Sequence, residues 1–361
     1  MKVMESTPQP KTLLNHRISI SGLNLLAWNP IDYKRRIEDP EQIDARHFRI
    51  GSAVDYVLTG SESFYNKYRL VVHQRPAGMM GDFVDHLLES VKDRGIHDIS
   101  IEDWEIYYLD AHVRAGYKTK AETVIKNFEN KPEIQGYFNE QLVADERIPI
   151  SAEEDQIVSR IVLALQTGDL TKKWILEMSA DPDIDTYDQL EIEWKYRGYD
   201  AVSHLDKVLV NHNAQMIHPM DLKTTGKSAY SFHQSVLKYG YFRQAAFYMR
   251  ALESWKLKDR RIKDYKIDNF RFIVAETACY TPPLVYKCTS NDITVGLHGG
   301  YLKNSAKYIK GVCDLIEDLK WHQHNNRWDI RREMALARVD GVELDLFDER
   351  STYSIVPLEN E

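Results

Sequence analysis

The chain of 361 residues contains only three cysteines and no long apolar run. The cysteines show no Cys-x-x-Cys spacing, which argues against a disulfide framework and a structural zinc, and they are too few for a four-cysteine iron–sulfur cluster. A membrane-spanning helix needs about 18 consecutive apolar residues, and none occurs. The first residues also lack the pattern of a secretory signal peptide. We therefore expect a cytoplasmic protein with no membrane partner and no iron–sulfur cofactor.

A surplus of basic residues is absent as well, because the formal net charge is −8. The acidic excess gathers in residues 339–361, which contain seven acids and one base, a net charge of −6. Residues 223–263 contain ten bases and two acids, a net charge of +8. Phosphate groups are bound by local rather than overall positive charge. Residues 223–263 are thus a candidate phosphate-binding segment, with a solvated basic helix face as the alternative.

Length and composition favour a globular chain with a packed core. Because a domain typically contains about 150 residues, 361 residues suggest roughly two domains. The 43% of hydrophobic residues is sufficient for a core. Residues 1–17 are largely polar and predict a flexible N-terminus. Apolar residues at three-to-four spacing predict a helical segment over residues 61–187. Residues 336–361 are expected to form an acidic tail.

An antiparallel hairpin is predicted over residues 204–225, where two β-prone runs flank a polar turn. Because side chains alternate faces along a strand, Asp221 and Lys223 lie together and Leu222 faces the opposite layer. Asp206 on the first strand brings a second carboxylate to the same sheet edge. Oxygen ligands suit a hard divalent cation, and a neighbouring lysine can orient or deprotonate a water. A solvated strand face is the commoner fate of an Asp-x-Lys triplet.

Other elements follow from the spacing of apolar residues. A long helix is predicted over residues 231–252, and it places Gln244 and Tyr248 one turn apart on one face. A buried polar pair at a helix interface is the alternative meaning of these two residues. Further strands are predicted over residues 190–200, 270–276 and 284–288, and further helices over residues 18–26, 48–58 and 293–318.

The order of these residues resembles the PD-(D/E)xK nuclease superfamily, and within it the RecB-like and RecE-like branch. That branch carries a Gly-x-x-x-His helix, an Asp, an Asp-x-Lys-Thr strand and a Gln-x-x-x-Tyr helix. The last three parts are present as Asp206, residues 221–224 and residues 244–248. The first part departs from the pattern, because Asp55 stands where the branch has histidine. An aspartate also suits Mg²⁺ or Mn²⁺, and a surface charge is the alternative.

The resemblance covers residues 18–60 and 188–335. It implies an α/β, restriction-endonuclease-like core, with a central mixed sheet flanked by helices and a large helical insertion. It also implies a Mg²⁺- or Mn²⁺-dependent DNA exonuclease of the RecE or lambda type, acting in recombination, repair or phage DNA processing. The expected catalytic residues are Asp206, Asp221 and Lys223. The expected metal ligands are Asp206, Asp221, the Leu222 carbonyl and Asp55. The expected DNA contacts are Gln244, Tyr248, Arg243, Thr224 and Lys227, with Glu193 or Glu191 as a possible additional acid.

Two other functions stay open at this point. A structure-specific endonuclease or flap trimmer would use the same residues, whereas a non-catalytic DNA-binding subunit would keep only the fold. The triad of Asp206, Asp221 and Lys223 favours catalysis, because a binding module has no need of it. The resemblance further implies a homo-oligomeric ring around DNA and a single-strand annealing protein as a partner. Three alternatives stay open for the acidic tail: it occupies the basic groove as a mimic of DNA, it recruits a partner protein, or it is simply disordered.

Overall fold

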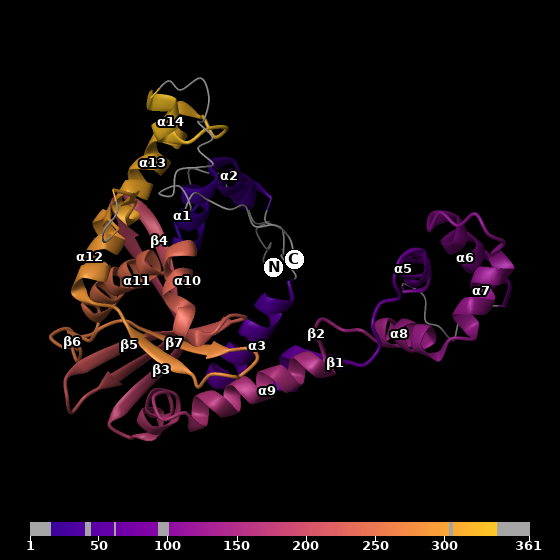
Figure 1. The fold of residues 1–361 in the computed structure, drawn as a ribbon, viewed down its shortest axis with the longest axis horizontal. Helices are drawn as coiled ribbons and strands as arrows, with labels where there is room; N and C mark the ends of the chain where they lie inside the picture. The colour runs from indigo at the N-terminus through magenta and orange to yellow at the C-terminus, as the bar shows by residue number, and fades with distance from the viewer. Residues whose placement is uncertain (1–15, 40–44, 61–62, 93–100, 303–305, 338–361) are drawn as a thin grey trace, which may run out of the picture.

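The computed structural model describes residues 16–39, 45–60, 63–92, 101–302 and 306–337. Nearly all of the expected N-terminal segment and of the acidic tail lie outside these ranges. The described residues form a mixed α/β structure in which helices cover a central mixed sheet (Figure 1). A second group of helices stands to one side of the sheet in the same view.

The central sheet has six strands. They are β3 (Ile184–Tyr196), β4 (Tyr199–Asn211), β5 (Met216–Thr225), β6 (Lys266–Ile267), β7 (Arg271–Glu276) and β8 (Leu284–Lys287). The strand order is β3-β4-β5-β7-β8, and the short β6 also pairs with β5. Neighbours pair antiparallel except where β5 runs parallel to β6 and β7. A parallel pair needs a long crossover connection, and the helices between β5 and β7 provide it.

Helices pack on both faces of this sheet. One face is covered by α1 (Ile20–Trp28), α2 (Pro30–Glu38), α10 (Phe232–Lys238), α11 (Tyr241–Lys256) and α13 (Val312–Asn325). The other face is covered by α3 (Arg46–Thr59), α9 (Ala152–Thr167) and the single π-helical turn η2 (Lys173–Glu177). Smaller elements are η3 (Met178–Ala180), η4 (Ala229–Ser231), α12 (Ser290–His298), β9 (Gly300–Tyr301), β10 (Tyr308–Ile309) and α14 (Arg332–Ala337). We call the sheet and these helices the body.

Alternation along the central strands explains why both faces are buried. On β7, Phe272 and Val274 belong to the core beneath α10 and α11, whereas Ile273 and Ala275 belong to the core beneath α3 and α9. All six residues of β7 are buried. A strand buried on both faces reads as a continuous apolar run, which is why this segment was recognisable in the sequence.

The helical group beside the body has a core of its own. It consists of α5 (Met79–Val91), α6 (Ile101–Arg114), α7 (Ala121–Glu129) and α8 (Pro132–Leu142), which we call the lobe. Two strands that pair in parallel, β1 (Tyr68–Val71) and β2 (Ile148–Ser151), connect the lobe to the body, and α4 (Phe64–Lys67) precedes them. Besides its helices, the described part of segment 61–187 includes β1, β2 and the start of β3, and its helix α9 belongs to the core of the body.

Several predicted elements are confirmed. The hairpin over residues 204–225 is β4 and β5, and the strand pair after residue 270 is β7 and β8. The helix at residues 18–26 is α1, where Ser19 is the N-cap and accepts a hydrogen bond from Gly22 N. The helix at residues 48–58 is α3.

Three predictions were wrong in extent. The strand over residues 190–200 is a tight hairpin, because Arg197 adopts a φ of 48° and turns the chain between β3 and β4. The helix over residues 231–252 breaks at Gly240, whose φ of +69° leaves the right-handed helical region and separates α10 from α11. The helix over residues 293–318 is α12 and α13, with β9 and β10 between them. Apolar spacing does not register a break at one or two residues, such as Gly240 or the turn at Arg197 and Gly198.

Candidate active site

The candidate site lies where two neighbouring strands stop pairing. Main-chain pairing between β4 and β5 ends at Lys207 and Met220, although both strands continue. Beyond this point β4 remains paired with β3, and β5 pairs with β7. The sheet therefore opens into a fork. Asp206 on β4 and residues 221–223 on β5 are the first residues inside it.

Asp206 occupies the apex of the fork. Its Oδ2 accepts a hydrogen bond from Leu222 N at 2.7 Å. A side-chain carboxylate thus takes the place of the main-chain acceptor that the departing strand no longer offers, which satisfies the amide of Leu222. The Leu222 side chain is 5% exposed and belongs to the core with α3 and α9, so the prediction that it faces the opposite layer is confirmed.

Asp221 is held from two directions. It is 2% exposed, and Gln244 Nε2 donates a hydrogen bond to its Oδ1 at 2.7 Å. The Lys223 ammonium forms an ion pair with its Oδ2. Gln244 comes from α11, and Lys223 comes from the same strand as Asp221. The structure therefore brings the Asp-x-Lys strand and the Gln-x-x-x-Tyr helix together at one carboxylate.

Asp55 approaches the fork from the opposite side of the sheet, on α3, which packs against β4 and β5. The close approach depends on Gly51, because a Cβ at that position would lie 3.2 Å from Thr224 Oγ1. Burial, and then the negative charge of Asp221, raise the pKa of Asp55 to about 7. Asp55 is therefore electrostatically coupled to Asp221 and Lys223, although it lies 151 positions before Asp206 in the chain.

The charges in the fork are strongly coupled. Burial, followed by the carboxylates of Asp221 and Asp55, raises the pKa of Asp206 well above its ordinary value. Burial alone would lower the pKa of Lys223, but the carboxylates of Asp221 and Asp206 outweigh it and raise that pKa. Three carboxylates thus share one ammonium. Because water has little access to the fork, this excess of negative charge is unfavourable unless a cation or a proton offsets it.

This donor set fits a divalent cation in type and in charge. Carboxylate and carbonyl oxygens are the ligands that Mg²⁺ and Mn²⁺ prefer. Asp221 Oδ1 accepts the hydrogen bond from Gln244, whereas its buried Oδ2 has the ion pair with Lys223 but no hydrogen bond. Within the described ranges no group of three or more His, Cys, Asp or Glu side chains is placed to hold a metal ion. A cation bound at Asp221 Oδ2 would have to compete with the Lys223 ammonium.

A clamp on α1 fixes the start of α11. Asn24 Nδ2 donates to the Tyr239 carbonyl at 3.1 Å, and Asn24 Oδ1 accepts from Arg243 Nε at 2.7 Å. Asn24 therefore bridges the break at Gly240. Arg243 Nη1 also donates to the Lys310 carbonyl at 3.0 Å, and burial lowers the pKa of Arg243 to about 10. The direction of α11, and with it the aim of Gln244 at Asp221, depends on these contacts.

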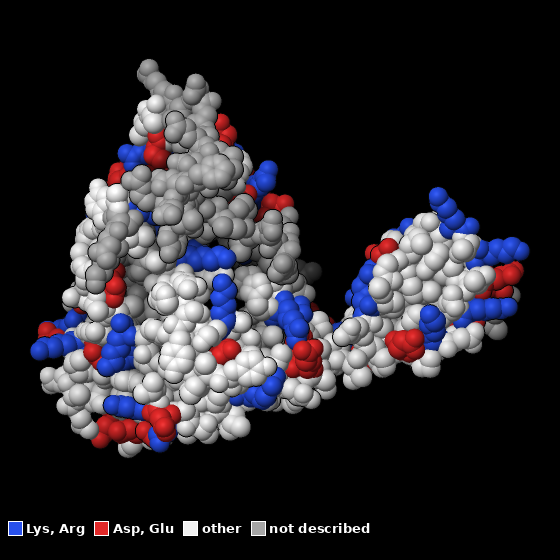
Figure 2. Space-filling view, in the orientation of Figure 1, with Lys and Arg blue, Asp and Glu red and all other residues white. Residues whose placement is uncertain are grey.

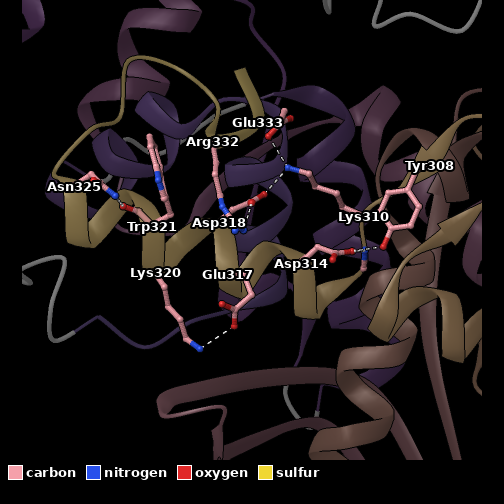
Figure 3. Close-up of polar contacts among 11 residues, drawn as sticks. Tyr308, Lys310, Asp314, Glu317, Asp318, Lys320, Trp321, Asn325, Arg332 and Glu333 are labelled. Carbon is pink, nitrogen blue, oxygen red and sulfur yellow. Dashed lines mark hydrogen bonds and ion pairs between the residues drawn. The ribbon is translucent and has the colours of Figure 1, made fainter. Parts of the chain in front are cut away.

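Ion pairs fix the segment around Lys310, whose carbonyl accepts the hydrogen bond from Arg243. Lys310 Nζ lies 2.6 Å from Asp318 Oδ2 and 2.8 Å from Glu333 Oε2, and Arg332 approaches the other oxygen of Asp318 at 3.4 Å (Figure 3). Burial alone would lower the pKa of Lys310, but the two carboxylates together raise it. This network lies between α13 and α14 and supports the fork only through Arg243.

The other residues expected to contact DNA lie in different surroundings. Tyr248 lies one turn after Gln244 and is 7% exposed, with burial and then the charge of Asp221 raising its pKa. Thr224 lies against α3, and Lys227 is exposed just beyond β5. Arg243 is buried in the clamp and points its guanidinium at α1 rather than into the fork.

Glu191 and Glu193 lie away from the fork. Both side chains are more than half exposed, and they contact His204 and Arg17, respectively. The structure thus places them on the solvated face of β3. The segment 223–263 is also not a single basic surface, since Arg243 is buried and the side chain of Lys223 is only 19% exposed. Figure 2 shows the lysines and arginines of one face scattered among uncharged and acidic residues.

Tyr68 is a residue of this region that the sequence did not indicate. It begins β1, is fully buried beside α3, and its hydroxyl has no hydrogen-bond partner. Burial, followed by the charge of Asp55, raises the pKa of Tyr68 to about 12. Its ring stacks on Phe64 with centroids 4.7 Å apart. An isolated tyrosine at the start of a four-residue strand carries no sequence pattern, so only the packing associates it with Asp55.

Comparisons with known proteins add little to this geometry. No protein-family model matches the chain, and no curated protein matches it. Among solved structures, the chain is similar to a crystal structure of a "Putative exonuclease" from Eubacterium rectale, with 11% sequence identity, 94% of each chain covered and a TM-score of 0.39. A TM-score of this size carries no argument about fold or function. Within the described ranges, no helix has the length and apolar character needed to span a membrane.

Proposed function

We propose that this protein is a metal-dependent deoxyribonuclease that hydrolyses the phosphodiester bonds of linear DNA. The observation that carries the proposal is the fork, in which Asp206, Asp221 and Lys223 meet and Gln244 is hydrogen-bonded to Asp221. A binding surface has no need to bury two carboxylates and an ammonium together, because burying charges is costly unless it serves a purpose or is fully compensated.

Asp206, Asp221, Asp55 and the Leu222 carbonyl would hold the metal. A bound Mg²⁺ or Mn²⁺ supplies charge that stabilises the phosphate in the transition state and lowers the pKa of a coordinated water. The protein's own contribution is to fix these ligands. Asp206 is fixed by Leu222 N, and Asp221 by Gln244, so neither carboxylate has to be reoriented on binding.

Lys223 would orient the attacking water and neutralise charge on the phosphate. Its ammonium lies beside Asp221 and its side chain is 19% exposed, so it is accessible from the open side of the fork. Attack of the water oxygen on phosphorus breaks the P–O3′ bond, and the proton of the water goes to the leaving oxygen. The products are a 5′-phosphate and a 3′-hydroxyl. Gln244 and the exposed Lys227 would contact the strand near the scissile bond, whereas Thr224 lies against α3 and Tyr248 is buried behind Gln244.

The resemblance in the sequence further suggests an exonuclease of the RecE or lambda type. It also suggests a homo-oligomeric ring and a single-strand annealing partner, in a cytoplasmic recombination, repair or phage pathway. These finer assignments rest on the sequence motifs alone. Light scattering of the full-length protein tests the ring, since a strictly monomeric mass would remove it.

The decisive experiment compares end-labelled linear DNA with covalently closed circular DNA of the same sequence. Each is incubated with the purified protein and Mg²⁺, Mn²⁺ or EDTA. We expect linear DNA to be degraded only with metal, and closed circles to remain intact. Cutting of closed circles would instead favour a structure-specific endonuclease.

A non-catalytic DNA-binding subunit is the second candidate. It is favoured by the ion pair that engages Asp221 and by the lack of a preformed group of three metal-binding side chains within the described ranges. For this candidate, the same experiment would show no cutting of either substrate at any metal concentration, while gel-shift assays would still show DNA binding.

A further inference from the structure

A column of aromatic rings leads from the fork to the surface. Lys223 Nζ lies 5.0 Å from the centre of the Tyr241 ring. The Tyr241 ring in turn lies 5.6 Å from the Tyr239 ring, at an interplanar angle of 35°. Tyr239 is 42% exposed. The outermost ring therefore connects, through one other ring, to the ammonium that contacts Asp221.

The inner end of the column is rigid. The Tyr241 ring stacks on Phe232 with centroids 5.7 Å apart and an interplanar angle of 21°, and Phe232 is 2% exposed. Asn24 Nδ2 fixes the Tyr239 main chain through its carbonyl. An exposed ring on a rigid support loses little conformational entropy when a ligand stacks on it.

A cation lies at the outer end of the column. Lys238 Nζ lies over the Tyr239 ring, 5.4 Å from its centre, and Lys238 is exposed at the end of α10, so a base that stacks on this face would displace the ammonium toward its phosphate. An aromatic face beside an ammonium matches the two parts of a nucleotide, because the base stacks on the ring and the phosphate pairs with the cation. Packing alone would explain Tyr241, which is largely buried, but not an exposed outer ring.

We propose that Tyr239 is a stacking platform for an unpaired base, and that the substrate enters the fork as a single strand or as a frayed single-stranded end. This inference rests on the proposed nuclease function and specifies its substrate. A base offers its flat face to a protein ring only when its neighbour in the helical stack has moved away. The platform therefore selects unpaired nucleotides, and the Tyr241 ring lies between them and Lys223.

Binding in EDTA tests the platform without hydrolysis. The probe is a single-stranded oligonucleotide with 2-aminopurine at one position, whose fluorescence is quenched when the base stacks. We expect quenching by the wild-type protein at one or two positions and its loss in Tyr239→Ala. We expect Tyr239→Ala to weaken single-strand binding about tenfold, as typical for one base–aromatic stack. Tyr239→Phe and Tyr239→Trp should retain both signals.

A matched control is Tyr301→Ala. Tyr301 is 71% exposed and pairs with Tyr308 at a centroid distance of 5.4 Å, much as Tyr239 pairs with Tyr241, but it is not part of the column. The Tyr301→Ala variant should bind single-stranded DNA with an affinity within about twofold of the wild type. Affinity for a blunt duplex should change little in either variant, because its bases are already stacked. Thermal unfolding of each variant identifies any that is misfolded. If Tyr239→Ala is misfolded, Tyr239→Leu decides, because leucine has no ring on which a base can stack and should lose both signals.

The outcomes separate this inference from the proposed function. Equal quenching and equal affinity in wild type and Tyr239→Ala would overturn the platform, even if the protein hydrolyses DNA. Quenching that depends on Tyr239 in a protein that never cuts DNA would support the platform and overturn the nuclease. If Tyr239→Ala lost as much affinity for duplex as for single-stranded DNA, the platform would also be overturned, because Tyr239 would then contact DNA of either form.

Discussion

The body and the lobe bury different kinds of side chain. In the described ranges, every buried polar or charged residue belongs to the body, including Lys207, Asp221 and Arg243. The lobe has an aromatic and aliphatic core, in which Phe128 contacts the rings of other residues at centroid distances of 5.4 to 5.9 Å. Its charged groups pair where solvent reaches them, as in Arg114 with Glu89.

This difference indicates which of the two regions is the candidate for catalysis. A buried charge lowers stability unless partners compensate it, so a chain that buries several charges in one region gives up stability there. Such sites are candidates for function, because perturbed pKa values accompany catalytic and ligand-binding groups. Within the described residues, the lobe has no buried charged side chain, and it is held together by apolar packing. We therefore expect the body to determine activity and the lobe to affect mainly its own stability.

The largest expected effect is that of Lys223→Ala on hydrolysis. Removing the ammonium should lower the single-turnover rate at least about 100-fold, because the water and the phosphate lose their positioning cation. DNA affinity should stay within a few-fold, since one cation among many contributes little to the electrostatic term. Lys195→Ala, at an exposed lysine paired with Asp200, is the control. A Lys223→Ala protein that cuts DNA at nearly the wild-type rate would show that the fork is not the active site.

The next effect is that of Phe128→Ala in the lobe. Loss of a buried phenyl ring typically costs about 3–5 kcal/mol. Hydrogen exchange should therefore quicken in α5 to α8 and remain unchanged in the strands of the body, while hydrolysis stays within about threefold. Faster exchange along β5 or β7 would mean that the two regions unfold together, and the comparison above would fail.

A smaller effect concerns pH and Asp55. Its pKa is raised to about 7 in the folded protein, whereas an unfolded aspartate titrates near pH 4. Between these values the folded protein binds more protons, so the free energy of unfolding falls as pH rises through this window, by up to about 1.4 kcal/mol per pH unit. Stability from this group is fully present below about pH 4 and is lost above pH 7.

Urea unfolding at pH 5 and pH 8, without metal, measures this slope. Asp55→Asn should flatten it in part, since the raised pKa of Asp206 contributes in the same direction. Mg²⁺ should flatten it in the wild type, because a cation favours the ionised carboxylates. A slope that neither the substitution nor Mg²⁺ alters would mean that Asp55 is not coupled to the site.

The smallest effect compares two glycines with similar backbone conformation. Gly240 in the body has a φ of +69° and Gly116 in the lobe has a φ of +75°. Alanine at either position costs about 1–2 kcal/mol for the left-handed conformation. A Cβ at Gly240 would also lie 2.5 Å from Arg243 Nη2 and 2.6 Å from Asn24 Oδ1, whereas one at Gly116 would meet nothing within 4 Å.

Thermal unfolding should therefore show a larger loss for Gly240→Ala than for Gly116→Ala, by roughly 1 kcal/mol. Only Gly240→Ala should also slow hydrolysis, because the clamp aims Gln244 at Asp221. Equal losses of stability, with unchanged activity in both variants, would show that the clamp does not control the site.

The sequence alone determined the local elements and the residues of the motif. The alternation that places Asp221 and Lys223 on one face and Leu222 on the other follows from the geometry of any strand, so it needs no tertiary information. The strand β7 and the helix α3 were predictable for the same reason, since apolar spacing records which side of an element is buried. The break at Gly240 and the turn at Arg197 and Gly198 were not, because one or two residues with positive φ hardly alter that spacing.

Only the tertiary structure decided how the motif is assembled. The sequence gives no sign that β4 and β5 stop pairing at Lys207 and Met220, because strand divergence depends on the competing partners β3 and β7. The hydrogen bond from Gln244 to Asp221, the electrostatic coupling of Asp55 and the buried hydroxyl of Tyr68 likewise join segments far apart in the chain. Local periodicity specifies faces, whereas a site depends on which faces meet, and packing of the whole chain sets that.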